Sequence, residues 1–328
     1  PAACAFVASA IAFIFEPSLA ENKTFVIITI WVCLWASTLL NFKGMKLSAF
    51  LSTSGVLSGT IIPGFIIIVL GVIYVVIGKD VNVDFSLDAL VPDFSNLNQI
   101  MLLAGMLMSI AGMEMSAVHI RNVKNPKKNY PKAIFISAII IILLSVLVSL
   151  AISIVIPDKS LSLSAGVMQA FHYFFKVFNM PWATPILSFF LAYGVFTMVI
   201  TWMVGPSKGL LEVAKEGYLP RTWQKRNKNN MPVGILYVQG IASTLLALAI
   251  LFMPSVSSAF WLMSALAAQL YLIMYLFMFA AAIKLRYSHA EVKRDYQIPG
   301  GKTGMWIVAG IAWLASFFVI IFGFIPPD

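Results

Sequence analysis

Glu114 is the one residue with a formal charge inside the hydrophobic spans that we predict for this 328-residue chain. An ionisable group at the centre of a bilayer costs about 3 kcal/mol or more, so membrane segments keep one mainly where it serves a pathway or a ligand site. A carboxyl group there can accept hydrogen bonds and interact electrostatically with a charged ligand. It can also gain or lose a proton when water enters its surroundings. The function is therefore to be sought around this residue.

Gly112 lies two residues before Glu114 and ends the stretch Ser109, Ile110, Ala111, Gly112. A helix that unwinds there exposes N–H and C=O groups, which lipid does not tolerate unless they face protein, water or a ligand. Half-helix ends at the middle of a membrane can bind a charged ligand. We predict a ligand site at this break. The alternative is close helix packing at Gly112 with Glu114 as a structural hydrogen-bond acceptor.

Three aromatic residues are further candidates. Tyr271 and Tyr275 are four positions apart in the middle of an apolar run, so they share one helical face. A buried phenol needs a hydrogen-bond partner, which favours a polar cavity or a ligand over simple packing. Trp202 lies near the end of its apolar run, where a site residue and an interfacial belt residue are both open interpretations.

The other reactive side chains do not combine into a catalytic or metal site. His119, His172 and His289 are dispersed and have no carboxylates at metal-ligand spacing. No GxSxG nucleophile motif occurs. Cys4 and Cys33 lie in apolar runs without CxxC spacing, so no disulfide or redox site is expected. We predict no catalytic residue, no metal, no cofactor and no enzyme activity.

Nine hydrophobic spans must position the candidate residues. The chain is 60% hydrophobic and 11% charged, whereas globular domains carry about 25% charged residues. Several apolar runs reach the ~20 residues that a bilayer requires. The run 161–178 is too short and polar to cross and is typical of an interfacial helix. The predicted spans are 1–15, 24–41, 47–78, 99–119, 133–156, 181–204, 232–253, 257–283 and 304–325.

Gly55 and Gly59 form a GxxxG pattern within the span 47–78, among several serines and threonines. Small residues at this spacing let two helix backbones approach closely. We interpret the pair as a close-packing or bending site rather than a contact between two copies of the chain.

Lysine and arginine are concentrated in four loops, which hold 18 of the 22 basic residues. Because basic residues accumulate on the cytoplasmic side of a membrane, we place these loops inside. The two faces then carry formal charges of +14 and −4. This topology and anionic lipid explain the net charge of +9, so no nucleic-acid partner is predicted. The four loops lie at 43–46, 121–132, 208–228 and 284–302.

Several segments resemble the amino acid/polyamine/organocation (APC) superfamily of permeases. The sixth-helix signature of this superfamily is similar to two segments of the chain, Gly112–Ala117 and Asn125–Ala133. Five further segments resemble bacterial glutamate/γ-aminobutyrate (GABA) antiporters, and the resemblance covers essentially the whole chain. They are Pro92–Ser95, Leu163–Gln169, Trp202–Leu210, Asn229–Val233 and Tyr296–Lys302.

The resemblance implies an all-α integral membrane protein with a LeuT-like inverted-repeat fold. Residues 1–78 would be the remnant of the first repeat (helices 3 to 5), 99–283 the second repeat (helices 6 to 10, with 99–119 as the broken helix) and 304–325 helix 11. Pro1 lies inside an apolar run, so we expect at least one preceding segment to be missing. The resemblance implies that helices 1, 2 and 12 of twelve are absent. We also expect the isolated chain not to transport.

The implied function is secondary active amino-acid transport, as a glutamate/GABA-type antiporter of the bacterial cytoplasmic (inner) membrane that works by alternating access. Its partners would be small amino acids and the lipid bilayer. Another amino-acid or amine exchanger of the superfamily, a nontransporting amino-acid sensor with the same fold, and a channel are alternatives. Met198 stands where the resemblance leads us to expect a carboxylate, so the substrate pair and the pH dependence stay open.

The resemblance also assigns roles to the candidate residues. Glu114 is interpreted as a gate or proton-sensitive latch beside the site rather than as a direct ligand of the amino acid. The implied substrate-binding residues are Ser109, Ile110, Ala111, Gly112, Trp202, Tyr271 and Tyr275.

Overall fold

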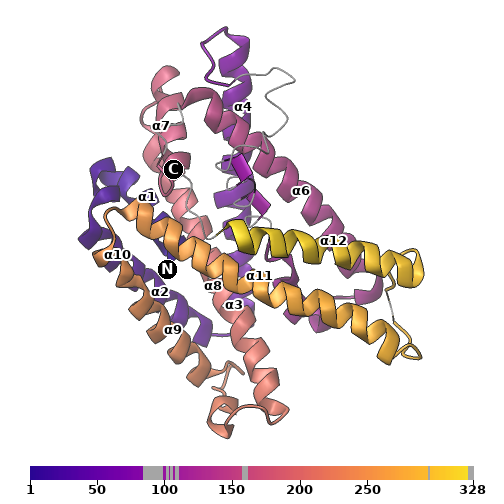
Figure 1. The fold of residues 1–328 in the computed structure, drawn as a ribbon. Coiled ribbons are helices and arrows are strands. Elements are labelled where there is room, and N and C mark those ends of the chain that lie inside the picture. The colour runs from indigo at the N-terminus through magenta and orange to yellow at the C-terminus, as the bar shows by residue number, and fades with distance from the viewer. Residues whose placement is uncertain are drawn as a thin grey trace. The chain divides into compact units, whose positions relative to one another are not determined.

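The computed structural model describes residues 1–83, 99–100, 103, 106–107, 111–156, 162–294 and 296–323, with the backbone alone at 118–119 and 121–122. These residues are almost entirely helical (Figure 1). The chain divides into two compact units. Unit 1 comprises Pro1–Asp84 and Leu143–Trp261, and unit 2 comprises Phe85–Ile142 and Leu262–Asp328.

Seven of the described helical segments are long and apolar enough to cross a membrane, and each matches a predicted span. They are α2 (Lys23–Phe42), α3 to α4 (Met45–Val76), α6 (Pro126–Val155), α8 (Ala183–Lys215), α9 to α10 (Val233–Phe252), α11 (Val256–Ser288) and α12 (Gly301–Phe322). The all-α membrane fold class is thereby confirmed. Of the other two spans, α1 (Ala2–Phe15) has 14 residues, about 21 Å of helix, and 99–119 is only partly described.

Some helices extend beyond the predicted spans into polar residues that flank those spans. Helix α6 begins at Pro126 rather than at 133, and α8 continues through Pro206 to Lys215. Hydropathy marks the part of a helix that suits lipid, whereas backbone hydrogen bonding continues into the polar region beyond it. The predicted and observed bounds therefore differ at the helix ends that carry basic residues.

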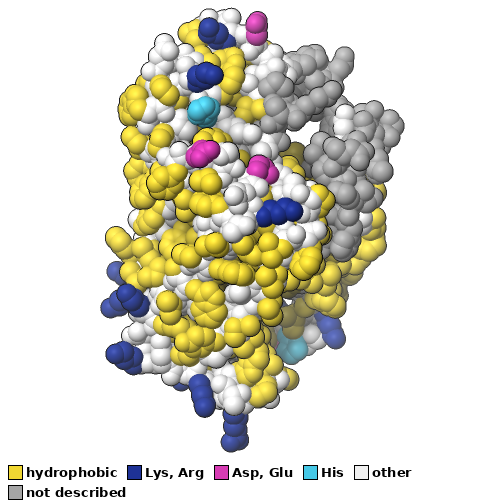
Figure 2. All heavy atoms as spheres, turned by 90° about the vertical axis from the view of Figure 1, so that its left-hand side faces the viewer, with side chains coloured by type: hydrophobic (Ala, Val, Ile, Leu, Met, Phe, Trp, Pro, Cys, Tyr) yellow, Lys and Arg dark blue, Asp and Glu magenta, His cyan; other side chains and the backbone are white. Residues whose placement is uncertain are grey.

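Large apolar side chains on these helices are exposed. On α6, for example, Phe135 is 66% exposed and Ile139 is 56% exposed. Figure 2 shows hydrophobic side chains over most of one face, with Lys and Arg side chains projecting at its lower end. Apolar patches of this extent are not stable in water and are covered by a bilayer. The chain is a multi-pass membrane protein.

Helix α8 is central to unit 1 and packs against α1, α2, α3 (Met45–Val56) and α7 (Gly166–Val177). The face of α1 is made of small buried residues, which permit this close approach. Helix α7 has 12 residues and buries Phe171, Phe174 and Phe175. The prediction of a short, non-crossing helix over 161–178 is therefore confirmed for the described residues.

The GxxxG pair lies where the segment Met45–Val76 crosses α8. A Cβ atom placed on Gly59 would lie 2.5 Å from the carbonyl oxygen of Phe190 and 2.7 Å from the nitrogen of Gly194. A Cβ atom on Gly55 would lie 2.8 Å from the Cβ of Thr197. The close-packing interpretation is confirmed. At the same place a π-helical turn, η2 (Leu57–Ile61), joins α3 to α4 (Ile62–Val76).

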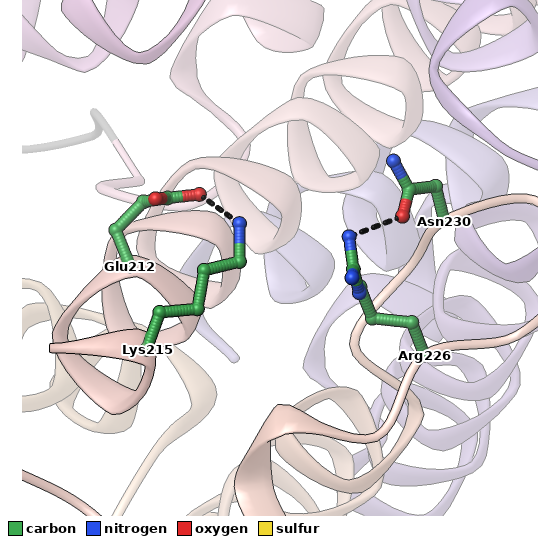
Figure 3. Close-up of polar contacts among 4 residues, drawn as sticks. All are labelled: Glu212, Lys215, Arg226 and Asn230. Atoms are coloured by element: carbon green, nitrogen blue, oxygen red, sulfur yellow. Dashed lines mark hydrogen bonds and ion pairs between the residues drawn. The ribbon is translucent and has the colours of Figure 1, made fainter. Parts of the chain in front are cut away.

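The loop between α8 and α9 (Val233–Ala247) is anchored to the end of α2. The side-chain amides of Asn227 and Asn229 both donate to the carbonyl oxygen of Phe42, each at 2.8 Å. These bonds satisfy a carbonyl that the helix end leaves without an intrahelical partner. Two further contacts in this region, Lys215 with Glu212 and Arg226 with Asn230, each measure 2.7 Å (Figure 3).

Candidate functional site

The predicted helix break is present at Ala111 and Gly112 in unit 2. Residues 106 and 107 are helical, Ala111 and Gly112 are not, and a 3-10 helix, η4 (Met113–Asn122), follows. Gly112 has φ 117° and ψ −2°, a left-handed conformation that glycine adopts without steric cost. The glycine therefore permits the turn that redirects the chain just before Glu114. Ser109 and Ile110 lie outside the described residues.

Tyr275 on α11 bridges this break to the carboxyl group. Its phenolic oxygen accepts a hydrogen bond from the backbone N–H of Gly112 at 2.9 Å. Its hydroxyl donates in turn to Glu114 Oε2. One phenol thus satisfies a backbone donor that the broken helix exposes and holds the ionisable side chain beside it. Gly112, Glu114 and Tyr275, which we predicted from the sequence, form one hydrogen-bonded group.

The second carboxyl oxygen of this group, Glu114 Oε1, is buried and has no hydrogen-bond partner among the described residues. Tyr271 lies close enough to Glu114 to interact with it electrostatically, and its ring packs edge-on against Tyr275 with centroids 5.5 Å apart. The predicted shared face of the two tyrosines is confirmed. A buried acceptor without a donor indicates a place where a proton or a ligand would be stabilised.

A cavity of about 380 Å³ adjoins Glu114 and Tyr275. Its lining is mostly apolar, so the carboxyl group has few competing polar neighbours. One wall comes from α12, which the sequence did not single out, because alanine, serine and valine in an apolar span carry no chemical signal. Their spacing of three, four and seven residues was the available indication that they share a face. That wall is formed by Ala312, Ala315, Ser316 and Val319.

Trp202 belongs to the other compact unit of the chain. It lies on α8 in unit 1 and is 40% exposed, with Met198 one turn earlier on the same helix. Its role in a substrate site stays a prediction. Among the residues that the structure describes, no cluster of three His, Cys, Asp or Glu side chains could hold a metal ion.

Replacing Tyr275 with phenylalanine tests the bridge. The ring and its packing would remain, but the N–H of Gly112 and Oε2 of Glu114 would lose their partner. An unsatisfied buried polar group costs about 1–3 kcal/mol, so we expect a melting temperature several degrees below that of the parent in thermal unfolding of the purified protein. Tyr296→Phe is the matched control, since Tyr296 is 51% exposed. Equal melting temperatures for both variants would show that the bridge does not stabilise the fold.

Comparison with known proteins gives consistent matches along the whole chain. The family model described as amino acid permease matches residues 1–328. The chain is 42% identical over 328 residues to an uncharacterized transporter of Legionella pneumophila, covering all of this chain and 70% of that protein. It is 32% identical over 326 residues to a glutamate/gamma-aminobutyrate antiporter of Lactococcus lactis, covering 98% of this chain and 65% of that protein.

A more distant relative is a probable agmatine/putrescine antiporter of Lactococcus lactis. The identity is 23% over 300 residues, which is 90% of this chain and 62% of that protein. The chain therefore spans slightly less than two thirds of the length of the antiporters that it resembles.

Proposed function

Because this chain belongs to the amino acid permease family, we propose that it serves in secondary active amino-acid transport, as a glutamate/GABA-type antiporter of the bacterial cytoplasmic membrane. The support for this substrate class is the 32% identity to a glutamate/gamma-aminobutyrate antiporter over 98% of the chain. The protein would exchange one amino acid for another by alternating access.

The observation that carries this proposal is the bridge at the helix break. The carboxylate of an amino acid requires free backbone N–H donors, and a helix break supplies them with a favourable dipole. The N–H of Gly112 donates to Tyr275 here. Binding of a substrate carboxylate at this amide would therefore require Tyr275 to move away. In this proposal Tyr275 occupies the substrate's position when no substrate is bound.

Glu114 would couple this movement to protons. It accepts from Tyr275 through Oε2, while Oε1 is buried without a donor among the described residues. Burial disfavours a charged carboxylate that is not fully hydrogen-bonded. A protonated Glu114 is a weaker acceptor, so Tyr275 would release both Glu114 and Gly112. Among the described residues, the titratable neighbours of Glu114 are Tyr271 and Tyr275.

Counterflow in proteoliposomes that contain the full-length protein tests the transport function. Vesicles preloaded with GABA should take up labelled glutamate faster than empty vesicles, and the rate should saturate with glutamate concentration. Vesicles preloaded with putrescine are the comparison for an amine exchanger. Saturable binding without counterflow would instead support a sensor, and an unsaturable ion current would support a channel.

A further inference from the structure

The segment 284–302, which runs from the last residues of α11 through the connection into the first residues of α12, is rich in cations. It contains five Lys and Arg residues and two Asp and Glu residues, a formal charge of +3. One cation has a structural role, because Arg294 donates to the carbonyl oxygens of Leu285 at 2.7 Å and His289 at 3.0 Å and so caps the end of α11. The others make no ion pair with any described residue. They are Lys284, Arg286, Lys293 and Lys302.

Tyr287 and Trp306 form a hydrogen-bonded platform beside one of these cations, Lys302. The indole Nε1–H of Trp306 donates to the hydroxyl oxygen of Tyr287 at 2.9 Å. The ammonium group of Lys302 lies 4.7 Å from the centroid of the Tyr287 ring. Since the Tyr287 oxygen accepts from Trp306, its own hydroxyl proton remains available to an outside acceptor. The platform therefore offers a hydroxyl donor and a cation for an anionic ligand.

This platform is accessible and lies at the ends of two membrane-capable helices. Tyr287 is 51% exposed and Trp306 is 53% exposed, and they belong to the candidate spans Val256–Ser288 and Gly301–Phe322. Half-exposed Tyr and Trp residues favour the depth of the lipid head groups. The distribution of basic loops assigns this end to the cytoplasmic side, where anionic lipids attract cations.

We propose that Lys302 and Tyr287 bind the phosphate of an anionic phospholipid in the cytoplasmic leaflet, with Arg286 adding attraction. Apolar surface next to the platform favours a lipid over a soluble anion. Ile307 and Ile311 follow Trp306 on α12 and are 56% and 64% exposed. Acyl chains would cover these side chains while the phosphate meets the cations.

Native mass spectrometry of the full-length protein, released from nanodiscs of phosphatidylcholine with a minor share of phosphatidylglycerol, tests the proposal. Removing one cation near an anionic lipid surface lowers the affinity for the anionic lipid by about fivefold. Lys302→Gln combined with Arg286→Gln should therefore lower retained phosphatidylglycerol by about tenfold or more. Tyr287→Phe keeps the ring beneath Lys302 and should lower it about threefold. The matched control is Arg221→Gln with Lys225→Gln, which removes two exposed cations elsewhere.

Three outcomes would overturn the proposal. The first is a control that loses as much phosphatidylglycerol as the platform variant, and the second is a parent that retains phosphatidylcholine equally well. The third is displacement of the lipid by millimolar inorganic phosphate, which would indicate a site for soluble anions. Melting temperatures in pure phosphatidylcholine identify a misfolded double variant. If the double variant is misfolded, the Tyr287→Phe variant provides the test instead. Unchanged retention of phosphatidylglycerol by Tyr287→Phe contradicts the assignment.

Discussion

Glu114→Gln is expected to raise glutamate/GABA exchange at pH 7.5 about tenfold, since weakening one hydrogen bond by about 1.4 kcal/mol changes a rate by that factor. The variant carries a neutral side chain of nearly the same shape, so it imitates protonated Glu114 at every pH. Tyr275 would then be held more weakly, because a neutral amide oxygen is a poorer acceptor than a carboxylate. Initial rates of counterflow in proteoliposomes between pH 5 and pH 8 measure the effect.

The matched control is Glu212→Gln, which removes a carboxylate whose side chain is 60% exposed and pairs with Lys215 at 2.7 Å. Exposed ion pairs contribute little, so its pH profile should follow the parent's. A parent profile that Glu114→Gln leaves unchanged at every pH would remove the proton-sensitive role. Loss of exchange at every pH, with a normal melting temperature, would instead indicate that the carboxylate is needed in its charged form.

The sequence located the core of the site because an ionisable group and a glycine are rare together in an apolar span. It also placed Tyr271 and Tyr275 on one face, since helical spacing is a local property. It did not identify Tyr275 as the partner of both Gly112 and Glu114. Those bonds join residues 163 and 161 positions apart, and nothing in either local pattern specifies which helices meet.

The spans were predictable for a different reason. The thickness of the bilayer fixes the length of an apolar run, so seven of them were found from hydropathy alone. Hydropathy did not predict the π-helical turn Leu57–Ile61. Such turns occur as short interruptions of α-helices, and this one lies where the segment approaches Gly194 on α8. Its position depends on that contact between distant segments rather than on local propensity.

Gly59→Ala should strongly destabilise unit 1. Its Cβ would lie 2.5 Å from the Phe190 carbonyl oxygen and 2.7 Å from the Gly194 nitrogen, and closer still to the Gly194 Cα. These are backbone atoms, so no side-chain rotation relieves the overlap and the two helices must separate. Overpacking of this kind costs about 3 kcal/mol. We expect a large loss of monodisperse protein in size-exclusion chromatography and a much lower melting temperature.

Gly64→Ala is the matched control, because it adds the same methyl group to the same helical segment. Its Cβ would lie 3.5 Å from Leu144 Cδ2 and 3.6 Å from Val148 Cγ2, at ordinary contact distance from side chains that can adjust. Both changes replace glycine by alanine in one continuous helical segment, Gly59 in its π-helical turn and Gly64 in α4, so both gain a similar helix propensity. The difference between the two melting temperatures therefore isolates the helix crossing. If the two variants melt together, the helices do not cross as closely as the structure indicates.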